Sequence, residues 1–302
     1  MSEYLSCDEV TSRMCSVSNS RGRPSSRSRR REGPPHPNQV RPVHGRTEQD
    51  RNRRTFGQNF LRDRRFITWI AESAGLNPGL PVIEAGPGEG LLTEALAKRG
   101  RGVTAYEIDP RLAATFRKRF ADRADIDIVP GDFLESEPPR EPFAFVGAIP
   151  YGITSAIVDW CLDAPSIVSA TMVTQLEFAR KRTGEYGRWS KRTVLTWPRF
   201  EWAFVGKIDR RLFRPVPKVD SAILRLRRRD PELLSDARLA HYKDLVELGF
   251  SGIGGSVRAS LQRRHPRRRV AAALEHAEIG QDTMVAFVHP DQWLLIFDRL
   301  DS

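Results

Sequence analysis

A group of three glycines and a carboxylate farther along the chain are the first residues whose types and spacing could do chemistry. Gly86, Gly88 and Gly90 follow a short apolar run, and Glu107 comes 21 residues after Gly86. Glycine lets a backbone turn tightly and approach a ligand closely, and a carboxylate at this separation can accept hydrogen bonds from both hydroxyls of a ribose. The pattern predicts a nucleoside-binding site.

The spacing of the glycines indicates which kind of nucleoside. The loop reads Gly-Pro-Gly-Glu-Gly, whereas dinucleotide sites that bind a pyrophosphate use the longer spacing GxGxxG. Glu84 and Glu89 beside the loop would also repel a phosphate group. A cationic nucleoside without phosphates fits an acidic loop better, and S-adenosylmethionine, with its sulfonium and amino groups, is such a ligand.

Two further segments stand where parallel sheets bind their ligands. Asp132 follows the third expected strand, where its carboxylate could accept a hydrogen bond from the amino group of an adenine, and Ala148–Tyr151 follows the fourth. Ligands of open parallel sheets bind outside the carboxyl ends of the strands. Four candidate segments at the ends of four successive strands therefore outline one cleft.

The elements that must position these residues alternate along the chain. Apolar runs predict strands over 81–85, 103–107, 126–129, 143–147 and 169–174. Helical spacing predicts helices over 63–75, with Asp63 as the N-cap, from the glycine loop to about 98, and over 111–120 and 153–162. Strands that alternate with helices in this way predict an α/β fold with a parallel sheet covered on both faces.

The alternation stops after residue 174. Runs at 194–197, 202–208 and 219–226 predict strands without helical connections between the later ones, and hence an antiparallel edge to the sheet. Beyond 229 the apolar spacing is helical, which predicts a small all-helical C-terminal domain. We therefore expect three parts: a disordered Arg-rich tail (1–50), a catalytic domain (51–228) and a helical RNA-binding domain (229–302).

Composition points to a polyanionic partner. The 302 residues carry a net charge of +11, and the stretch from Arg21 to Arg54 alone holds eleven arginines against three acids. No apolar stretch is long enough for a membrane span or a signal peptide, so we expect a cytoplasmic protein. The three cysteines, at positions 7, 15 and 161, have no spacing typical of zinc or redox sites, so we expect neither a disulfide nor a bound metal.

With these motifs in place, the chain from residue 54 to about 300 resembles the ribosomal RNA adenine dimethyltransferases. Within that family it is most similar to the erythromycin-resistance (Erm) branch, because of Gln175–Arg180 and the Arg-rich N-terminal arm. The resemblance implies a Rossmann-like class I methyltransferase fold. The motifs that carry it are Phe56–Leu61, Glu84–Gly90, Tyr106–Asp109, Gly131-Asp132, Ala148–Tyr151 and Phe213–Ser221.

The resemblance also implies a function and a set of site residues. The function is transfer of methyl groups from S-adenosylmethionine to the exocyclic amine of one adenine in 23S rRNA, which gives resistance to macrolide, lincosamide and streptogramin B antibiotics. Tyr151 would stack on the flipped adenine, and Phe178 would form a second stacking wall. The implied cofactor-binding residues are Asn59, Leu61, Gly86, Gly88, Glu107, Ile108, Asp132 and Ala148.

Ala148 departs from the family pattern, which usually has Asn at this position. An adenine amine is a weak nucleophile, so the site must hold it in line with the sulfonium methyl while two acceptors bind its hydrogens. With alanine at 148, we expect the main-chain carbonyls of Gly147 and Ile149 to act as these acceptors, with Pro150 fixing their direction.

Three groups of basic residues are candidates for RNA contact, because Lys and Arg neutralise phosphates. We expect the partner to be 23S rRNA, bound by a monomer before or during assembly of the large subunit. The candidates are Arg51, Arg53, Arg54, Arg180, Lys181, Arg182, Arg263, Arg264 and Arg267.

Two alternatives remain open at this point. The missing Asn at position 148 would also suit a catalytically retired paralogue that only binds RNA. The same motifs would suit an enzyme that dimethylates adenine in small-subunit rRNA.

Overall fold

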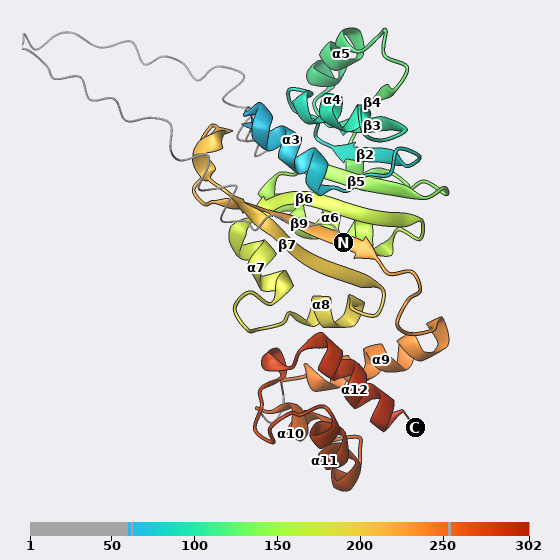
Figure 1. Cartoon of the computed structure of the whole chain (residues 1–302), viewed down its shortest axis with the longest axis vertical. Coiled ribbons are helices and arrows are strands. Elements are labelled where there is room, and N and C mark those ends of the chain that lie inside the picture. Colours follow the sequence, from blue (N-terminus) through green and yellow to red (C-terminus); the bar gives the residue numbers. More distant parts are fainter. Residues whose placement is uncertain (1–59, 62, 253–254, 302) are drawn as a thin grey trace, which may run out of the picture. The chain divides into compact units, whose positions relative to one another are not determined.

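The computed structural model describes residues 60–61, 63–252 and 255–301, and its elements are labelled in Figure 1. The predicted tail over 1–50 lies outside this part of the chain. No helix within it is long and apolar enough to cross a membrane. The strands are β1 (Phe60–Leu61), β2 (Pro81–Ala85), β3 (Gly102–Glu107), β4 (Ile126–Pro130), β5 (Phe143–Ala148), β6 (Ile167–Gln175), β7 (Phe200–Ile208), β8 (Phe213–Arg214) and β9 (Ser221–Arg228).

The helices separate into those that cover a sheet and those that pack on one another. The first group is α3 (Arg64–Ser73), α4 (Leu91–Ala97), α5 (Pro110–Arg119), α6 (Thr154–Asp163) and α7 (Leu176–Thr183). The second is α8 (Lys191–Thr196), α9 (Asp236–Gly249), α10 (Val257–Leu261), α11 (Arg267–His276) and α12 (Pro290–Leu300). Short 3-10 turns are η1 (Phe133–Glu135), η2 (Tyr151–Ile153), η3 (Arg210–Leu212) and η4 (Val285–Phe287).

The central sheet has seven strands in the order β4-β3-β2-β5-β6-β9-β7 (Figure 1). The strands from β4 to β6 are parallel, while β9 is antiparallel to both of its neighbours, so the expected α/β fold with an antiparallel edge is confirmed. The strand order reverses between β2 and β5, which is the point where open parallel sheets bind ligands.

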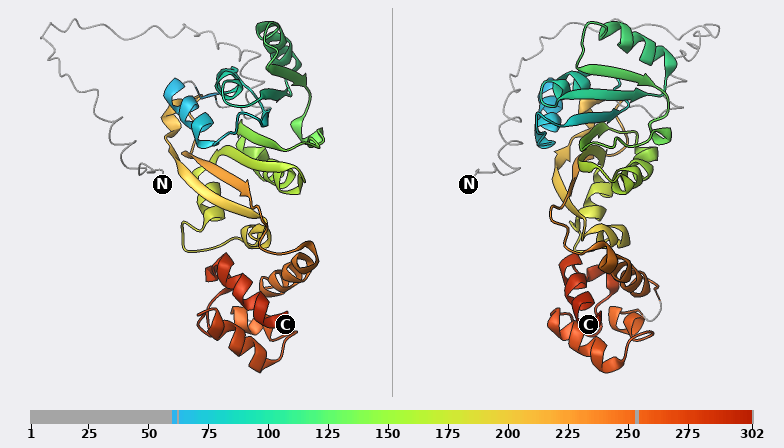
Figure 2. Two further views of the ribbon diagram at one scale, coloured as in Figure 1. Left: turned by 45° about the vertical axis from the view of Figure 1, so that its right-hand side comes forward. Right: turned by 90° about the vertical axis from the view of Figure 1, so that its right-hand side faces the viewer.

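Alternating side chains of each strand form the two faces of the sheet. Val82 belongs to the core under α3, α4 and α5, whereas its neighbour Ile83 belongs to the core under α6. Figure 2 shows helices on both sides of the sheet. β2 and β5 are buried along nearly their whole length, which explains why they read as apolar runs, whereas β3 and β4 alternate between buried and more exposed residues.

A two-stranded antiparallel sheet joins β1 to β8, with Phe60 opposite Arg214 and Leu61 opposite Phe213. The two most specific sequence motifs, which contain Phe60 and Phe213, therefore lie side by side although they are some 150 residues apart. No local pattern indicates such a pairing.

The predicted strand over 194–197 is wrong, because Lys191–Thr196 forms the helix α8. Ser190 caps this helix by accepting a hydrogen bond from the main-chain nitrogen of Thr193. Val194 packs among the C-terminal helices, and its carbonyl accepts a hydrogen bond from the Tyr242 hydroxyl at 2.9 Å. A short apolar run has no period that distinguishes a strand from a helix, and here packing on α9 decides.

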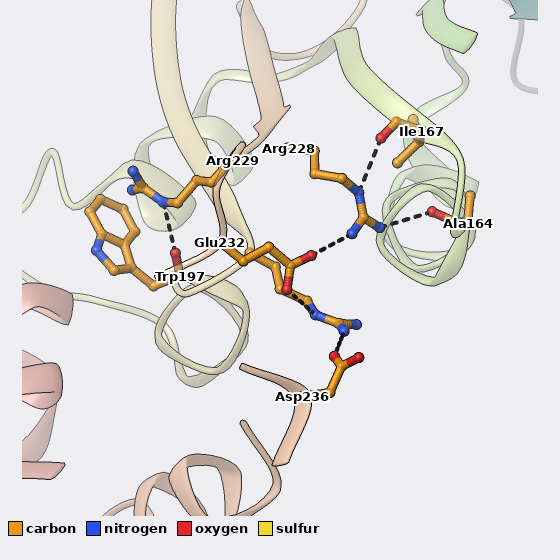
Figure 3. Close-up of polar contacts among 8 residues, drawn as sticks. Ala164, Ile167, Trp197, Arg228, Arg229, Glu232 and Asp236 are labelled. Carbon is orange, nitrogen blue, oxygen red and sulfur yellow. Dashed lines mark hydrogen bonds and ion pairs between the residues drawn. The ribbon is translucent and has the colours of Figure 1, made fainter. Parts of the chain in front are cut away.

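The segment between β9 and α9 is held by charged side chains (Figure 3). Arg228 donates to Glu232 at 2.8 Å and to the carbonyls of Ala164 and Ile167, while Arg199 pairs with Glu232 and Asp236. Every charge in this group has an opposite partner. The division of domains at residue 228 stays a prediction, but the chain leaves the sheet at this position.

Candidate active site

A cavity of about 390 Å³ opens at the carboxyl ends of β2, β3, β4 and β5, around the point where the strand order reverses. Its volume lies in the range of small-molecule sites. The residues predicted from sequence that line it are Leu61, Gly86, Gly88, Glu107, Ile108, Asp132, Ala148, Ile149, Pro150 and Tyr151. Asn59 lies outside the described residues.

The glycine loop is closed by an aromatic ring from β1. A Cβ atom on Gly88 would lie 3.0 Å from Cδ1 of Phe60, and the φ of Gly88 is +58°, so a side chain would be strained and crowded here. Gly90, with φ +74°, is the N-cap of α4, and a Cβ there would lie 3.1 Å from the ring of Phe120. The loop therefore keeps its backbone exposed to the cavity at Gly86 and Gly88.

Glu107 is the strongest candidate for binding a diol. Its side chain is 1% exposed at the end of β3, and Oε1 accepts a hydrogen bond from the main-chain nitrogen of Asp109 at 3.0 Å. Oε2 is buried with no hydrogen-bond partner among the described residues. Burial raises the pKa of this carboxyl. A buried acceptor without a donor is costly, so a ligand hydroxyl here would remove that cost.

A second buried carboxyl lies close by. Glu84 accepts a 2.6 Å hydrogen bond from the Thr93 hydroxyl, and burial raises its pKa to about 8, with a further contribution from the charge of Glu107. Glu84 is therefore mostly protonated at neutral pH in the absence of a cation. The repulsion of phosphate expected from Glu84 is therefore weaker than the sequence alone indicates.

Asp132 begins the turn after β4. Its Oδ1 accepts a hydrogen bond from the main-chain nitrogen of Leu134 at 2.9 Å, which caps η1 and fixes the direction of the carboxylate. Asp132 and Ile108 both line the cavity, and Ile108 is 42% exposed. A carboxylate beside an exposed aliphatic side chain can bind the amino edge and the face of an adenine ring.

Ala148 ends β5, and Ile149, Pro150 and Tyr151 follow it directly; all four line the cavity. The Tyr151 hydroxyl lies 2.6 Å from Oγ of Ser221 at the start of β9, and burial raises the pKa of this tyrosine. The main-chain nitrogen of Ile153 donates to the carbonyl of Pro150 at 3.2 Å, which leaves that carbonyl engaged in η2. Gly147 is buried in β5 and is not among the lining residues, whereas Ile149 is.

Two aromatic residues differ in where they lie. Phe178, expected as a stacking wall, does not line the cavity; it lies on α7 with the guanidinium of Arg182 5.0 Å above its ring. Phe213 does line the cavity, on β8, and is 2% exposed. Sequence reasoning missed the roles of Phe213, Phe60 and Ser221, although all three lie within the quoted motifs.

The predicted RNA-contacting residues lie outside the cavity lining. Arg180, Lys181 and Arg182 form the last turn of α7, where Arg182 is half-buried and donates to the Ser190 hydroxyl at 2.8 Å. Arg263, Arg264 and Arg267 are exposed at and before the start of α11. Arg51, Arg53 and Arg54 precede the described part of the chain.

The donor set of the cavity is suited to a nucleoside rather than to a metal. Across 60–61, 63–252 and 255–301, no three His, Cys, Asp or Glu side chains are grouped as metal ligands. Cys161 is buried and unpaired, and burial raises the pKa of its thiol. The unpartnered Oε2 of Glu107 and the open glycine backbone fit a nucleoside with free ribose hydroxyls.

Comparisons with known proteins agree with this geometry. Residues 49–302 match the family model described as ribosomal RNA adenine dimethylase. The chain is 67% identical over 274 residues to an rRNA adenine N-6-methyltransferase of Saccharopolyspora erythraea, covering 91% of this chain and 72% of that one. It is 33% identical to the mycinamicin-resistance protein MyrB of Micromonospora griseorubida, covering 81% and 78%.

A solved structure is equally similar. The crystal structure of the 23S rRNA methyltransferase ErmE matches with a TM-score of 0.79 and 66% identity, covering 81% of this chain and all of that one. The chain is a methyltransferase and belongs to the ribosomal RNA adenine dimethylase family.

Proposed function

We propose that this protein transfers methyl groups from S-adenosylmethionine to the exocyclic amine of one adenine in 23S rRNA, and so confers resistance to macrolide, lincosamide and streptogramin B antibiotics. The observation that carries the proposal is that Glu107, with its unpartnered buried oxygen, and the Ala148–Tyr151 turn line one cavity. The names of the relatives, one a 23S rRNA methyltransferase and one a mycinamicin-resistance protein, support the choice of substrate and the phenotype.

The cofactor half of the cavity binds through groups at the ends of β2, β3 and β4. Glu107 accepts the ribose hydroxyls, and Asp132 accepts the adenine amine beside the aliphatic side chain of Ile108. Glu84 shifts towards its ionised form when a cation enters, because an opposite charge lowers a carboxyl pKa. S-adenosylmethionine supplies an electrophilic methyl group on a sulfonium; the protein residues only hold and orient it.

The target half binds the adenine that is to be methylated. Tyr151 stacks on the extruded base, and Phe213, which lines the same cavity, is the better second wall than Phe178. The Ile149 carbonyl accepts one hydrogen of the amine and orients its lone pair towards the methyl group. The proton leaves after the nitrogen is alkylated, so no strong base is required beforehand.

Affinity for the RNA comes from outside the cavity. We infer that the basic residues on α7 and around α11, together with Arg51, Arg53 and Arg54, neutralise rRNA phosphates. In this proposal residues 51–228 act as the catalytic domain and 229–302 as the helical RNA-binding domain, in a cytoplasmic monomer. The RNA is bound before or during large-subunit assembly, when the target adenine is accessible.

Incubation with tritiated S-adenosylmethionine and purified 23S or 16S rRNA tests the proposal. We expect label in adenine of 23S rRNA. Label in 16S rRNA alone would show instead that the enzyme methylates small-subunit rRNA. RNA binding without label in either would support the retired paralogue suggested by Ala148.

A further inference from the structure

Two aromatic rings stand exposed outside the cavity. Tyr186 is 46% exposed and Phe287 is 41% exposed, and they are the two aromatic residues among the exposed large hydrophobic side chains of the described residues. Each carries an arginine over its ring: Arg180 lies 5.8 Å from the ring centroid of Tyr186, and Arg188 lies 5.1 Å from that of Phe287. Exposed rings beside guanidinium groups are the surface that unpaired bases stack on.

The loop that presents Tyr186 and Arg188 is ordered by its own backbone. Gly184 ends α7 with φ +74°, and a Cβ there would lie 2.5 Å from the ring of Trp189. The main-chain nitrogen of Gly187 donates to the carbonyl of Gly184 at 2.8 Å. Tyr186 therefore stands on a tight turn, which lowers the entropy that must be lost when a ligand binds.

One hydrogen bond joins this loop to the helical part of the chain. The main-chain nitrogen of Trp189 donates to the carbonyl of Ala286 at 2.7 Å, next to Phe287 in η4. The Trp189 ring also makes an edge contact with His289, with centroids 4.6 Å apart. Arg188 on this loop thus lies over the ring of Phe287 in η4, so the loop after α7 and η4 are in direct contact.

The charge of this surface suits a polyanion. Residues 177–192 contain six basic and two acidic side chains. One of the acids, Glu177, accepts hydrogen bonds from the Tyr186 hydroxyl at 2.8 and 2.9 Å, which orient the ring. A protein partner would have no need of this excess of positive charge, whereas a nucleic acid strand would use both the charge and the rings.

We propose that Tyr186, Arg188 and Phe287 form a stacking platform for unpaired bases of the rRNA, outside the cavity that takes the target adenine. The proposal rests on the proposed function, because it takes rRNA as the partner. It gives the junction between α7 and η4 a role in selecting single-stranded RNA, which phosphate contacts alone do not provide.

The test uses the full chain with Tyr186→Ala and Phe287→Ala combined. Its affinity is measured for a single-stranded RNA oligomer of mixed sequence and for the fully paired duplex of the same length. We expect the double variant to bind the single strand at least about 10-fold more weakly, since each stacked base contributes on the order of 5- to 100-fold. Affinity for the duplex should change less than about twofold, because paired bases present no free face.

Two controls separate stacking from general damage. Leu233→Ala and Leu295→Ala each remove an exposed apolar side chain that has no aromatic ring, since Leu233 is 46% exposed and Leu295 on α12 is 39% exposed. Both should bind the single strand as the unmodified chain does. In methylation of 23S rRNA, the double variant should raise the KM for RNA and leave kcat and the affinity for S-adenosylmethionine unchanged.

Equal loss of affinity for the single strand and the duplex would overturn the platform, as would no loss for either. Ultraviolet crosslinking of the unmodified chain to the oligomer is an independent readout, and crosslinks at Tyr186 or Phe287 are expected. Failure of the proposed function looks different: the unmodified chain would then label no adenine in 23S rRNA, whatever the oligomer binding shows.

Discussion

The two ends of the cavity are built in different ways. At the end of β3, Glu107 holds a buried oxygen without a partner, and Glu84 nearby is a buried carboxyl with a pKa of about 8. At the end of β5, the Tyr151 hydroxyl is already bonded to Ser221, and Ala148 has no polar side-chain atom. The first end, in the cofactor half, therefore depends on side chains that have no partner without a ligand. The second end, in the target half where the base binds, depends on the direction of the backbone and on aromatic faces.

In the proposed mechanism, this difference makes alanine at position 148 compatible with activity. There the acceptor for the amine is the main-chain carbonyl of Ile149, whose direction Pro150 fixes. The side chain at position 148 then contributes little. A loss at Glu107 has no such substitute, because no other buried carboxylate oxygen in the described cavity lacks a partner.

The largest expected effect is on the pH dependence of the free energy of unfolding, which the buried carboxyl of Glu84 at the cofactor end controls. Unfolded, Glu84 ionises near its ordinary pKa of 4.5, while folded it ionises near pH 8, so the folded state holds an extra proton between these values. The free energy of unfolding should therefore fall by roughly 3–5 kcal/mol as pH rises from about 4.5 to 8. Glu84→Gln should remove most of this slope in urea unfolding measured without cofactor.

A slope in Glu84→Gln as steep as in the unmodified chain would mean that other groups carry the pH dependence. Tyr151 titrates only above this range, since its pKa is raised from 10, so the base-binding end contributes nothing to the slope.

The next effect is on cofactor affinity. Glu107→Gln keeps the shape of the side chain but removes the charge that accepts the ribose hydroxyls, so S-adenosylmethionine should bind about 100-fold more weakly, as expected for charged hydrogen bonds. Calorimetry measures this directly. Asp127→Asn, an exposed carboxylate on the adjacent strand β4, is the matched control and should bind normally. Equal affinity in both variants would contradict the role of Glu107.

The aromatic walls of the base-binding end give a smaller effect. Phe213→Leu keeps apolar volume but removes the flat face, and it should lower kcat/KM for 23S rRNA by about 10-fold, the order expected for one stacked base. Phe178→Leu should change it less than about twofold, because Phe178 does not line the cavity. If Phe178→Leu has the larger effect, the assignment made from sequence is right and the one made from geometry is wrong.

The smallest effect concerns the bond between Tyr151 and Ser221. Tyr151→Phe and Ser221→Ala should each lower kcat by about 3- to 10-fold, because the ring still stacks but is less firmly oriented. The double variant should be no worse than either single one, which is the signature of a shared interaction. Additive losses in single-turnover methylation would show that the two residues act independently.

The local patterns predicted the strands and the residues at their ends, because both depend on short stretches of chain. Burial on both faces makes β2 and β5 readable as apolar runs, and Asp63, Asp109 and Asp132 cap the elements that follow them. The strand expected at 194–197 is wrong. This segment is helical, and the apolar Val194 packs against the C-terminal helices rather than in a sheet.

The parts of the site that were missed depend on contacts distant in sequence. Phe213 reaches the cavity through the pairing of β8 with β1, and Ser221 reaches Tyr151 across 70 residues. Nothing in the spacing of these residues reveals such contacts. The family resemblance favours Phe178 as the second wall, but on α7 its ring lies under Arg182 instead.

Mass mapping of rRNA from cells that carry the unmodified gene or the Glu107→Gln form tests the central claim most directly. The account predicts methylation at one adenine of 23S rRNA with the unmodified gene, and no methylation at that position with Glu107→Gln. Methylation that is absent in both, or equal in both, would contradict it.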